Sequence, residues 1–121
     1  MHEVSLCQSI QRIVGRSARG RRVVVVDVDV GEFRQVVPET LETCWTLVTA
    51  GTALNGSRLA VRRLPGILGC RDCAATTRVT GPPLLRCGAC ASTAVDILGG
   101  EEFMVRSVEV EDGDGTVPPS R

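Results

Sequence analysis

The sequence predicts an α/β fold: a small three-stranded sheet with two helices, plus an inserted zinc-ribbon domain. Two segments with the apolar spacing of helices alternate with three segments rich in β-branched residues. A pair of CxxC motifs lies between the second and the third of those β segments. With 121 residues and 12.9 kDa, the chain can build one modest core or two very small ones.

The first expected helix covers residues 4–16. Its apolar residues recur at the spacing of one helical face: Leu6, Ile10, Ile13 and Val14. Gly15 and Gly20 weaken its end. Around and beyond that end lies a basic stretch, which we expect to face solvent: Arg12, Arg16, Arg19, Arg21 and Arg22.

The second expected helix begins near Pro38, a residue suited to a first helical turn. Glu39 and Glu42 favour the positive end of the helix, and Gly51 suits its end. Its predicted buried face consists of Leu41, Cys44, Trp45 and Val48. Cys7 and Cys44 each lie beside the apolar face of a helix, so we expect both to act as small hydrophobic side chains.

Three segments predict strands: residues 21–32, 58–64 and 101–110. The last of them changes the phase of its alternation near Ser107, which predicts a bulge or a sheet edge. The predicted domains are residues 1–66 together with 101–112 for the α/β layer and 67–100 for the zinc ribbon. The remaining residues, 113–121, combine acid, glycine and proline and are expected to be disordered.

The strongest signal for a bound metal lies in the segment CRDCAATTRVTGPPLLRCGAC. Two CxxC pairs, Cys70 with Cys73 and Cys87 with Cys90, are separated by thirteen residues. Two such turns close a tetrahedral Zn(II) site with Zn–S distances of ~2.3 Å. Because four thiolates leave no open position, the zinc is expected to be structural. The residues between the pairs suffice for a two-stranded ribbon that turns at 81–83.

A redox role for the CxxC pairs is the alternative, but two pairs at this spacing favour zinc. Four thiolates and one Zn(II) carry a formal charge of −2. Arg71, Arg78 and Arg86 are close enough in sequence to offset that charge, or are simply solvated.

A second metal site is suggested by the opening residues MHE. The α-amine of Met1 and the amide nitrogen of His2 close a five-membered ring on a metal. That amide nitrogen and the imidazole Nδ1 of His2 close a six-membered ring. The fourth position is open to the Glu3 amide, the Glu3 carboxylate or an outside donor. Planar nitrogen sets of this kind suit Ni(II) or Cu(II) better than Zn(II). The alternative is that His2 is a frayed terminal residue.

Composition excludes several classes of function. Net charge is zero, so no overall field favours nucleic acid or an anionic membrane, and we expect neither as a partner. The chain has no lysine, so it contains no P-loop. It also lacks a secretory signal and a run of about 18 apolar residues, which predicts a cytoplasmic protein. No residue constellation indicates catalysis, so we expect no enzyme activity.

The chain resembles the HypA/HybF family of nickel metallochaperones. The opening MHEVSLCQSI, the segment DVDVGEFRQVVPETLETCWTLVTAGTAL, the two CxxC motifs and GGEEFMVRSVEV carry this resemblance. Family members often have CxxCG at the first motif and a proline after the first cysteine of the second. Here Ala74 and Gly88 stand at those positions. Two other classes remain as alternatives, a zinc-ribbon nucleic-acid-binding protein and a thiol redox enzyme.

The resemblance implies nickel bound by His2 and the Met1 amine, with Glu3 contributing, and zinc at Cys70, Cys73, Cys87 and Cys90. It also implies delivery of nickel to the [NiFe]-hydrogenase large subunit, together with a maturation GTPase. The absent P-loop agrees with a separate GTPase. Urease stays open as a second client.

Overall fold

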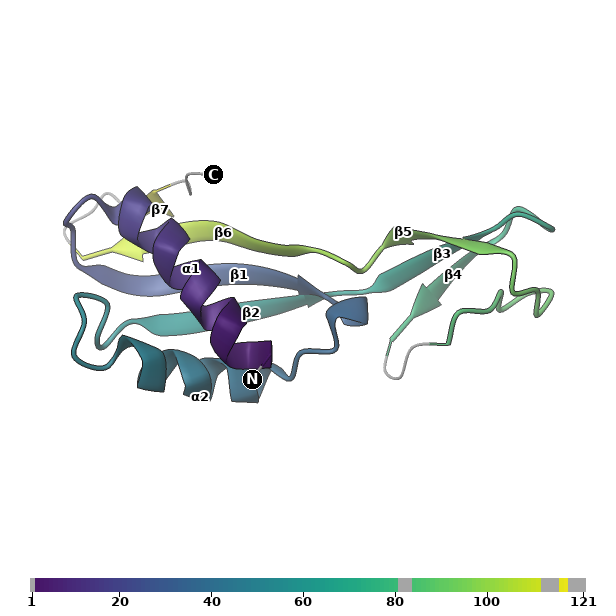
Figure 1. Ribbon diagram of the computed structural model, residues 1–121. Coiled ribbons are helices and arrows are strands. Elements are labelled where there is room, and N and C mark those ends of the chain that lie inside the picture. The colour runs from purple at the N-terminus through teal and green to yellow at the C-terminus, as the bar shows by residue number, and fades with distance from the viewer. Residues whose placement is uncertain (1, 81–83, 112–115, 118–121) are drawn as a thin grey trace. The chain divides into compact units, whose positions relative to one another are not determined.

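The computed structural model describes residues 2–80, 84–111 and 116–117, without the side chains of His2 and of residues 116–117. The chain forms two compact units (Figure 1). Unit 1 contains Met1–Asp29, Val36–Arg62 and Met104–Arg121. Unit 2 contains Val30–Gln35 and Arg63–Phe103.

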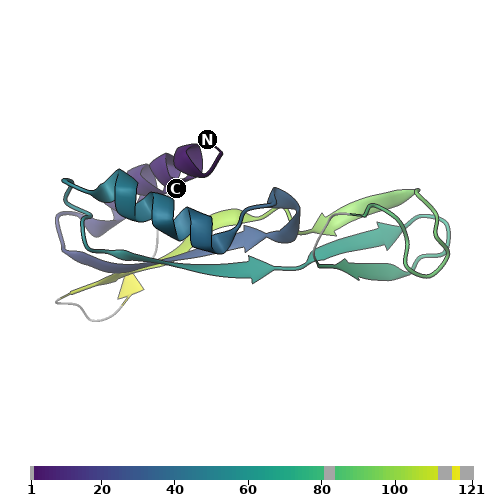
Figure 2. The same cartoon turned by 90° about the horizontal axis from the view of Figure 1, so that it is seen from below.

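Unit 1 is a four-stranded sheet with two helices on one face (Figure 2). The strand order is β2-β1-β6-β7. Its elements are α1 (His2–Ala18), β1 (Val23–Gly31), α2 (Pro38–Thr49), β2 (Arg58–Leu64), β6 (Phe103–Val110) and β7 (Thr116–Val117). The predicted α/β fold with two helices is therefore confirmed.

The fourth strand was not expected from the sequence. β7 pairs antiparallel with β6, with Val108 opposite Val117. It falls within the segment predicted to be disordered, 113–121, whose other residues lie outside the described part of the chain.

Helix α1 buries a face that is rotated slightly from the predicted one. Cys7, Ile10 and Val14 are fully buried, whereas Leu6 is half-buried. The Cys7 thiol donates a hydrogen bond to the Leu41 carbonyl of α2, 3.5 Å away. The face of α1 that packs against α2 therefore contains Cys7. The helix runs two residues further than predicted and ends before Arg19, which adopts a left-handed φ of 52°.

Helix α2 follows its predicted boundaries closely, with Pro38 in the first turn. Leu41, Trp45 and Thr49 are its most buried side chains, at 0%, 1% and 1% exposure. The Trp45 indole N–H donates to the Ser57 hydroxyl at 2.9 Å, and that hydroxyl donates to the Leu54 carbonyl. The buried indole therefore keeps its hydrogen bond inside the core.

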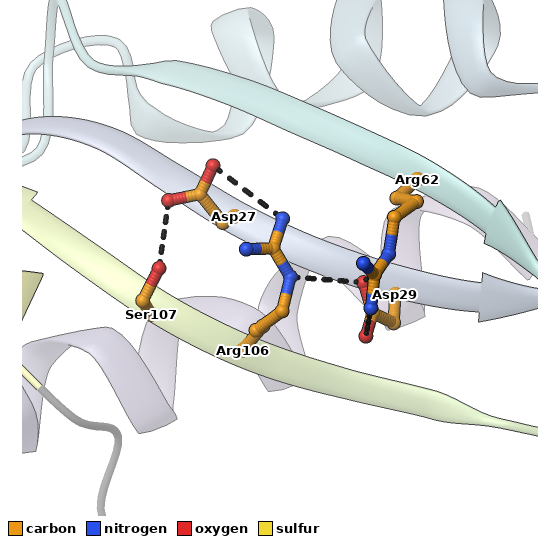
Figure 3. A network of polar contacts seen from close by, with 5 residues as sticks. All are labelled: Asp27, Asp29, Arg62, Arg106 and Ser107. Carbon is orange, nitrogen blue, oxygen red and sulfur yellow. Dashed lines mark hydrogen bonds and ion pairs between the residues drawn. The ribbon is translucent and has the colours of Figure 1, made fainter.

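The opposite face of the unit 1 sheet carries a polar network (Figure 3). Asp29 is 2% exposed and accepts two hydrogen bonds from Arg62, at 3.0 and 2.8 Å, and one from Arg106 at 3.2 Å. Asp27 accepts a hydrogen bond from the Ser107 hydroxyl at 2.8 Å. Because each buried carboxylate has partners on a neighbouring strand, the network joins β1, β2 and β6.

Within β6, the alternation changes phase where the sequence predicts. Val105 and Val108, three residues apart, are both buried. Arg106 and Ser107 are consecutive, yet both side chains reach the carboxylates of β1. Neighbouring residues of a regular strand point to opposite faces, so we infer a bulge at this point.

Unit 2 is a three-stranded sheet in the order β4-β3-β5, and both strand pairs are antiparallel. The strands are β3 (Gly66–Cys70), β4 (Thr76–Val79) and β5 (Val95–Gly99). The predicted two-stranded ribbon between the CxxC pairs was wrong. The first CxxC turn itself reverses the chain, so β4 pairs with β3, which precedes that turn. The predicted turn at 81–83 lies outside the described residues.

Val30–Gln35 also belongs to unit 2, through a close contact around Phe33. The Phe33 amide donates to the Gly100 carbonyl at 2.8 Å. A Cβ added at Gly66 would lie 2.5 Å from the Phe33 ring, and one at Gly100 would lie 2.7 Å from it. Glycine at both positions therefore leaves the room that the ring occupies.

Candidate metal centre

The four cysteines of the two CxxC motifs lie close together in unit 2. The thiol sulfurs of Cys70, Cys73, Cys87 and Cys90 lie within 4.8 Å of one another. The closest pairs join the two motifs: Cys70 to Cys90 and Cys73 to Cys87, each 3.6 Å apart. A tetrahedral site with Zn–S bonds of ~2.3 Å needs S–S separations of about 3.8 Å. The four sulfurs are thus close to the geometry that Zn(II) requires.

The two CxxC turns have the same backbone hydrogen-bond pattern. In the first, the amides of Asp72 and Cys73 point at the Cys70 sulfur, 3.3 and 3.4 Å away. In the second, the amides of Ala89 and Cys90 point at the Cys87 sulfur at the same two distances. Such N–H groups stabilise a thiolate, which is the form that binds metal.

The residue after each turn adopts a left-handed conformation. Ala74 has a φ of 66° and Ala91 a φ of 65°. The departures from the family pattern at Ala74 and Gly88 therefore do not change the fold of the turns. Alanine at a positive φ is strained by roughly 1–2 kcal/mol relative to glycine.

The surroundings of Cys87 and Cys90 shift the pKa values of these two thiols in opposite directions. Hydrogen bonds from the backbone N–H groups of Cys90 and Ala89 lower the pKa of the Cys87 thiol to about 6. At Cys90 a backbone hydrogen bond from Ser92 acts to lower the pKa, but contact with the Cys70 thiol and burial raise it, to about 12 overall. Four thiolates in one place repel one another, so a bound dication is what allows all four to ionise.

Two hydrogen bonds around the cysteine cluster could not be predicted from the sequence. The Gly88 amide donates to the Thr77 hydroxyl at 2.9 Å, which ties the second turn to β4. The Ser92 hydroxyl donates to the Asp72 carboxylate, which ties the second turn to the first. Both depend on the strand register and on the meeting of the two turns, and neither is a local property of the sequence.

The three arginines that were expected to offset the site's charge differ in their surroundings. Arg71 lies 3.7 Å from the carboxylate of Asp96. Arg78 and Arg86 line a hollow beside Cys87 and have no ion pair with any described residue. Only two of the three are therefore free to meet a further charge.

The predicted nickel ligands lie at the start of α1. The helix begins at His2, and Glu3 is a half-buried residue of its first turn. Met1 and the His2 side chain lie outside the described residues. The first amides of a helix have no intrahelical acceptor, so the amide nitrogens of His2 and Glu3 are not needed for the helix.

Cys7 and Cys44 lie on the facing sides of α1 and α2. Burial is the main cause that raises the pKa of Cys7, to about 11, and the nearby charges of Cys44 and Glu3 add to it. A thiol with this pKa stays protonated at neutral pH and is a poor ligand or nucleophile. This environment agrees with a packing role.

In the described part of the chain, neither helix is long and apolar enough to cross a membrane.

Comparison with known proteins identifies the family. A family model described as hydrogenase/urease nickel incorporation, metallochaperone, hypA matches residues 1–110. The hydrogenase maturation factor HypA of Geobacter sulfurreducens is 42% identical over 113 residues, which cover 92% of this chain and 100% of that protein. The protein of the same name from Streptomyces avermitilis is 38% identical, with 93% and 89% covered.

The fold agrees with this assignment. The solution structure of the Ni metallochaperone HypA from Helicobacter pylori has a TM-score of 0.62 and 21% sequence identity, and the match covers 91% of this chain and 97% of that one. At this identity the likeness concerns the fold alone. The resemblance predicted from the sequence is confirmed, and the chain belongs to the HypA family of nickel metallochaperones.

Proposed function

We propose that this protein binds Ni(II) at its N-terminus and delivers it to the [NiFe]-hydrogenase large subunit during maturation. The observation that carries the proposal is the family match over residues 1–110, which includes both the MHE terminus and all four clustered cysteines. Nickel is cargo in this proposal, and zinc is the resident metal.

The nickel site is proposed to consist of the Met1 amine, the His2 amide and the His2 imidazole, with Glu3 as a further ligand. The start of α1 at His2 supports this set of ligands. The amide nitrogens of His2 and Glu3 lie in the first helical turn, where an amide has no acceptor within the helix. Binding must release any proton that the imidazole or the α-amine carries, and the His2 amide nitrogen must also give up its proton to coordinate the metal. Affinity for nickel therefore falls as the pH falls below neutrality.

The zinc site is proposed to hold unit 2 together. Support comes from the S–S separations of 3.6 Å and from the four amides that point at Cys70 and Cys87. A sheet of three short strands has little core of its own, so the free energy of metal binding takes over part of that role. Four thiolates saturate a tetrahedral ion, so this zinc is not expected to exchange ligands during nickel transfer.

The partners are proposed to be a hydrogenase maturation GTPase and the hydrogenase large subunit, in the cytoplasm. The sequence itself has no lysine, so nucleotide hydrolysis through a P-loop has to come from a second protein. We propose no catalytic activity for this chain.

The decisive experiment is a Ni(II) titration of untagged protein beside a form with one residue added before Met1 and the His2→Ala variant. If the amine is a ligand, the extended form should bind nickel roughly tenfold more weakly or worse, nearly as weakly as His2→Ala. Both changes break a fused ring of the same chelate, and tenfold corresponds to ~1.4 kcal/mol. Mass spectrometry of the untagged protein checks that Met1 is retained.

Gln8→Ala, an exposed change two turns along α1, is the matched control and should leave nickel binding and zinc content unchanged. Equal affinity of the untagged and extended forms would remove the amine from the site. Equal affinity of all forms would place the nickel elsewhere in the chain.

A further inference from the structure

A hollow of about 500 Å³ runs along the outer side of β4 in unit 2. On the β4 side it is lined by three consecutive residues, Thr77, Arg78 and Val79. Successive residues of a strand point to opposite faces, so a hollow lined by three in a row lies along the strand's edge and not over one face. Its volume is within the range of ligand-binding sites.

Among the described residues, no further strand pairs with the outer edge of β4. The strand order β4-β3-β5 places it at the border of the sheet, and no backbone hydrogen bond between described residues occupies its outer side. An edge strand with free N–H and C=O groups is a template for one more strand from another chain.

The charge along this edge is positive on the side that faces solvent. Arg78 and Arg86 line the hollow, no carboxylate does, and neither guanidinium has an ion pair with a described residue. A second hollow of about 260 Å³ shares Arg78 and adds Arg63, whose guanidinium lies 3.6 Å from the Glu32 carboxylate. Cys87 also borders the first hollow, but it is only 3% exposed and its sulfur already accepts two backbone N–H groups.

The other edge of the sheet carries a paired charge instead. β5 carries Asp96, which is more than half exposed and lies 3.7 Å from Arg71. The charge of Asp96 is therefore offset by Arg71, whereas Arg78 and Arg86 beside β4 have no ion-pair partner among the described residues, so an acidic chain is attracted more strongly to β4.

Apolar side chains complete the hollow. Val79, Leu84 and Ala91 line it, and Leu84 is 59% exposed although it is a large hydrophobic residue. No aromatic residue lines the hollow, so it offers no stacking platform for a nucleic acid. A strand with alternating acidic and apolar side chains matches both the arginines and these apolar groups, because its residues alternate between two faces.

We propose that the edge of β4 binds an extended acidic segment of a partner protein, as an added strand whose carboxylates meet Arg78 and Arg86. This site is separate from the nickel ligands at the N-terminus. It would give the metallochaperone a docking surface that does not occupy its cargo site.

The test uses the zinc-loaded full chain and a fluorescein-labelled octapeptide of alternating glutamate and valine. We expect saturable binding by fluorescence anisotropy with a Kd below about 100 µM, and amide NMR shifts concentrated at residues 76–80 and 84–91. A peptide with glutamine in place of glutamate should bind at least tenfold more weakly. A peptide with alternate amides N-methylated should lose binding equally, because it keeps the charges but not the strand hydrogen bonds.

Arg78→Gln and Arg86→Gln should each weaken binding of the glutamate peptide about fivefold, or ~1 kcal/mol. Arg71→Gln is the matched control, since it removes the same charge from the same unit outside the hollow, and it should have no effect. Zinc content is measured for every variant to show that unit 2 stays folded. Equal binding of the glutamate and glutamine peptides, equal loss in Arg71→Gln, NMR shifts at β5, or tighter binding of a single-stranded DNA octamer would each overturn the proposal.

Discussion

Asp29 illustrates how this sheet keeps a carboxylate almost fully buried. Burial acts to raise its pKa, but the hydrogen bonds and charges of Arg62 and Arg106 outweigh that effect, so the pKa of Asp29 is lowered. The two guanidinium groups are about half exposed, so they bring part of their hydration with them. The desolvation cost of the Asp29 ion pairs with Arg62 and Arg106 is therefore lower than that of an ion pair fully enclosed in a core.

Replacing Asp29 by asparagine should lower the free energy of unfolding of unit 1 by about 2 kcal/mol at neutral pH, because the arginines lose their buried partner. The folded pKa is lowered, so this stabilisation is present above the unfolded pKa of ~3.9 and is lost as the pH falls through and below that value. The variant should lack this part of the acid dependence. Urea unfolding from pH 7 to pH 3, followed by Trp45 fluorescence, measures both effects.

Glu111→Gln is the control for that experiment. Its carboxylate lies 3.6 Å from Arg22, with both side chains more than 60% exposed, so its loss should change stability by less than ~0.5 kcal/mol. An Asp29→Asn variant as stable as this control at neutral pH would mean that the buried pair contributes nothing.

At the scale of elements, the two helices of unit 1 and its strands β1, β2 and β6 could be predicted because apolar periodicity is a local property of the sequence, whereas β7 could not. The sequence could not predict that Cys7 is more buried than Leu6, because this depends on the position of the Leu41 carbonyl in another helix. The clustering of the four CxxC cysteines could be predicted from their spacing alone. The contact of Phe33 with Gly66 and Gly100 had no such signal, because the three residues are far apart in the chain.

Gly66→Ala should destabilise unit 2 by about 2–4 kcal/mol, because its new methyl group would lie 2.5 Å from the Phe33 ring. Phe33→Leu in the same chain should restore part of the loss by removing the ring. Zinc retention against a chelator, measured for both variants and for the wild type, reports the stability of unit 2. Equal retention in Gly66→Ala and wild type would show that the ring moves aside freely.

The CxxC turns permit a second prediction at this scale. Cys73→Ser or Cys90→Ser should lose the zinc and disorder residues 67–100, because a structural site rarely tolerates loss of one of four ligands. Unit 1 should remain folded, since its core contains no zinc ligand. Metal analysis gives the zinc content, and Trp45 fluorescence reports unit 1. Variants that keep full zinc content would refute the four-thiolate assignment.

At the scale of the whole molecule, this protein is expected to act through complexes. Mixing it with its maturation GTPase should produce a complex measurable by calorimetry at tens of micromolar, and nickel transfer should depend on the nucleotide bound to that GTPase. His2→Ala protein mixed with the same amount of Ni(II) is the control for transfer, since it should still form the complex but bind and deliver little nickel. Absence of heat at these concentrations would exclude a partnership of ordinary affinity.

The start of α1 at His2 would have an electrostatic consequence for nickel held at the proposed N-terminal site. The amino end of a helix carries about half a positive charge, which disfavours a cation by roughly 0.3–1 kcal/mol per unit charge. Binding of a dication there would therefore be weakened by about 0.6–2 kcal/mol, or roughly threefold to thirtyfold in Kd. An acceptor site away from a helix start has no such penalty, so the macrodipole of α1 would favour transfer of nickel from the proposed site to the acceptor.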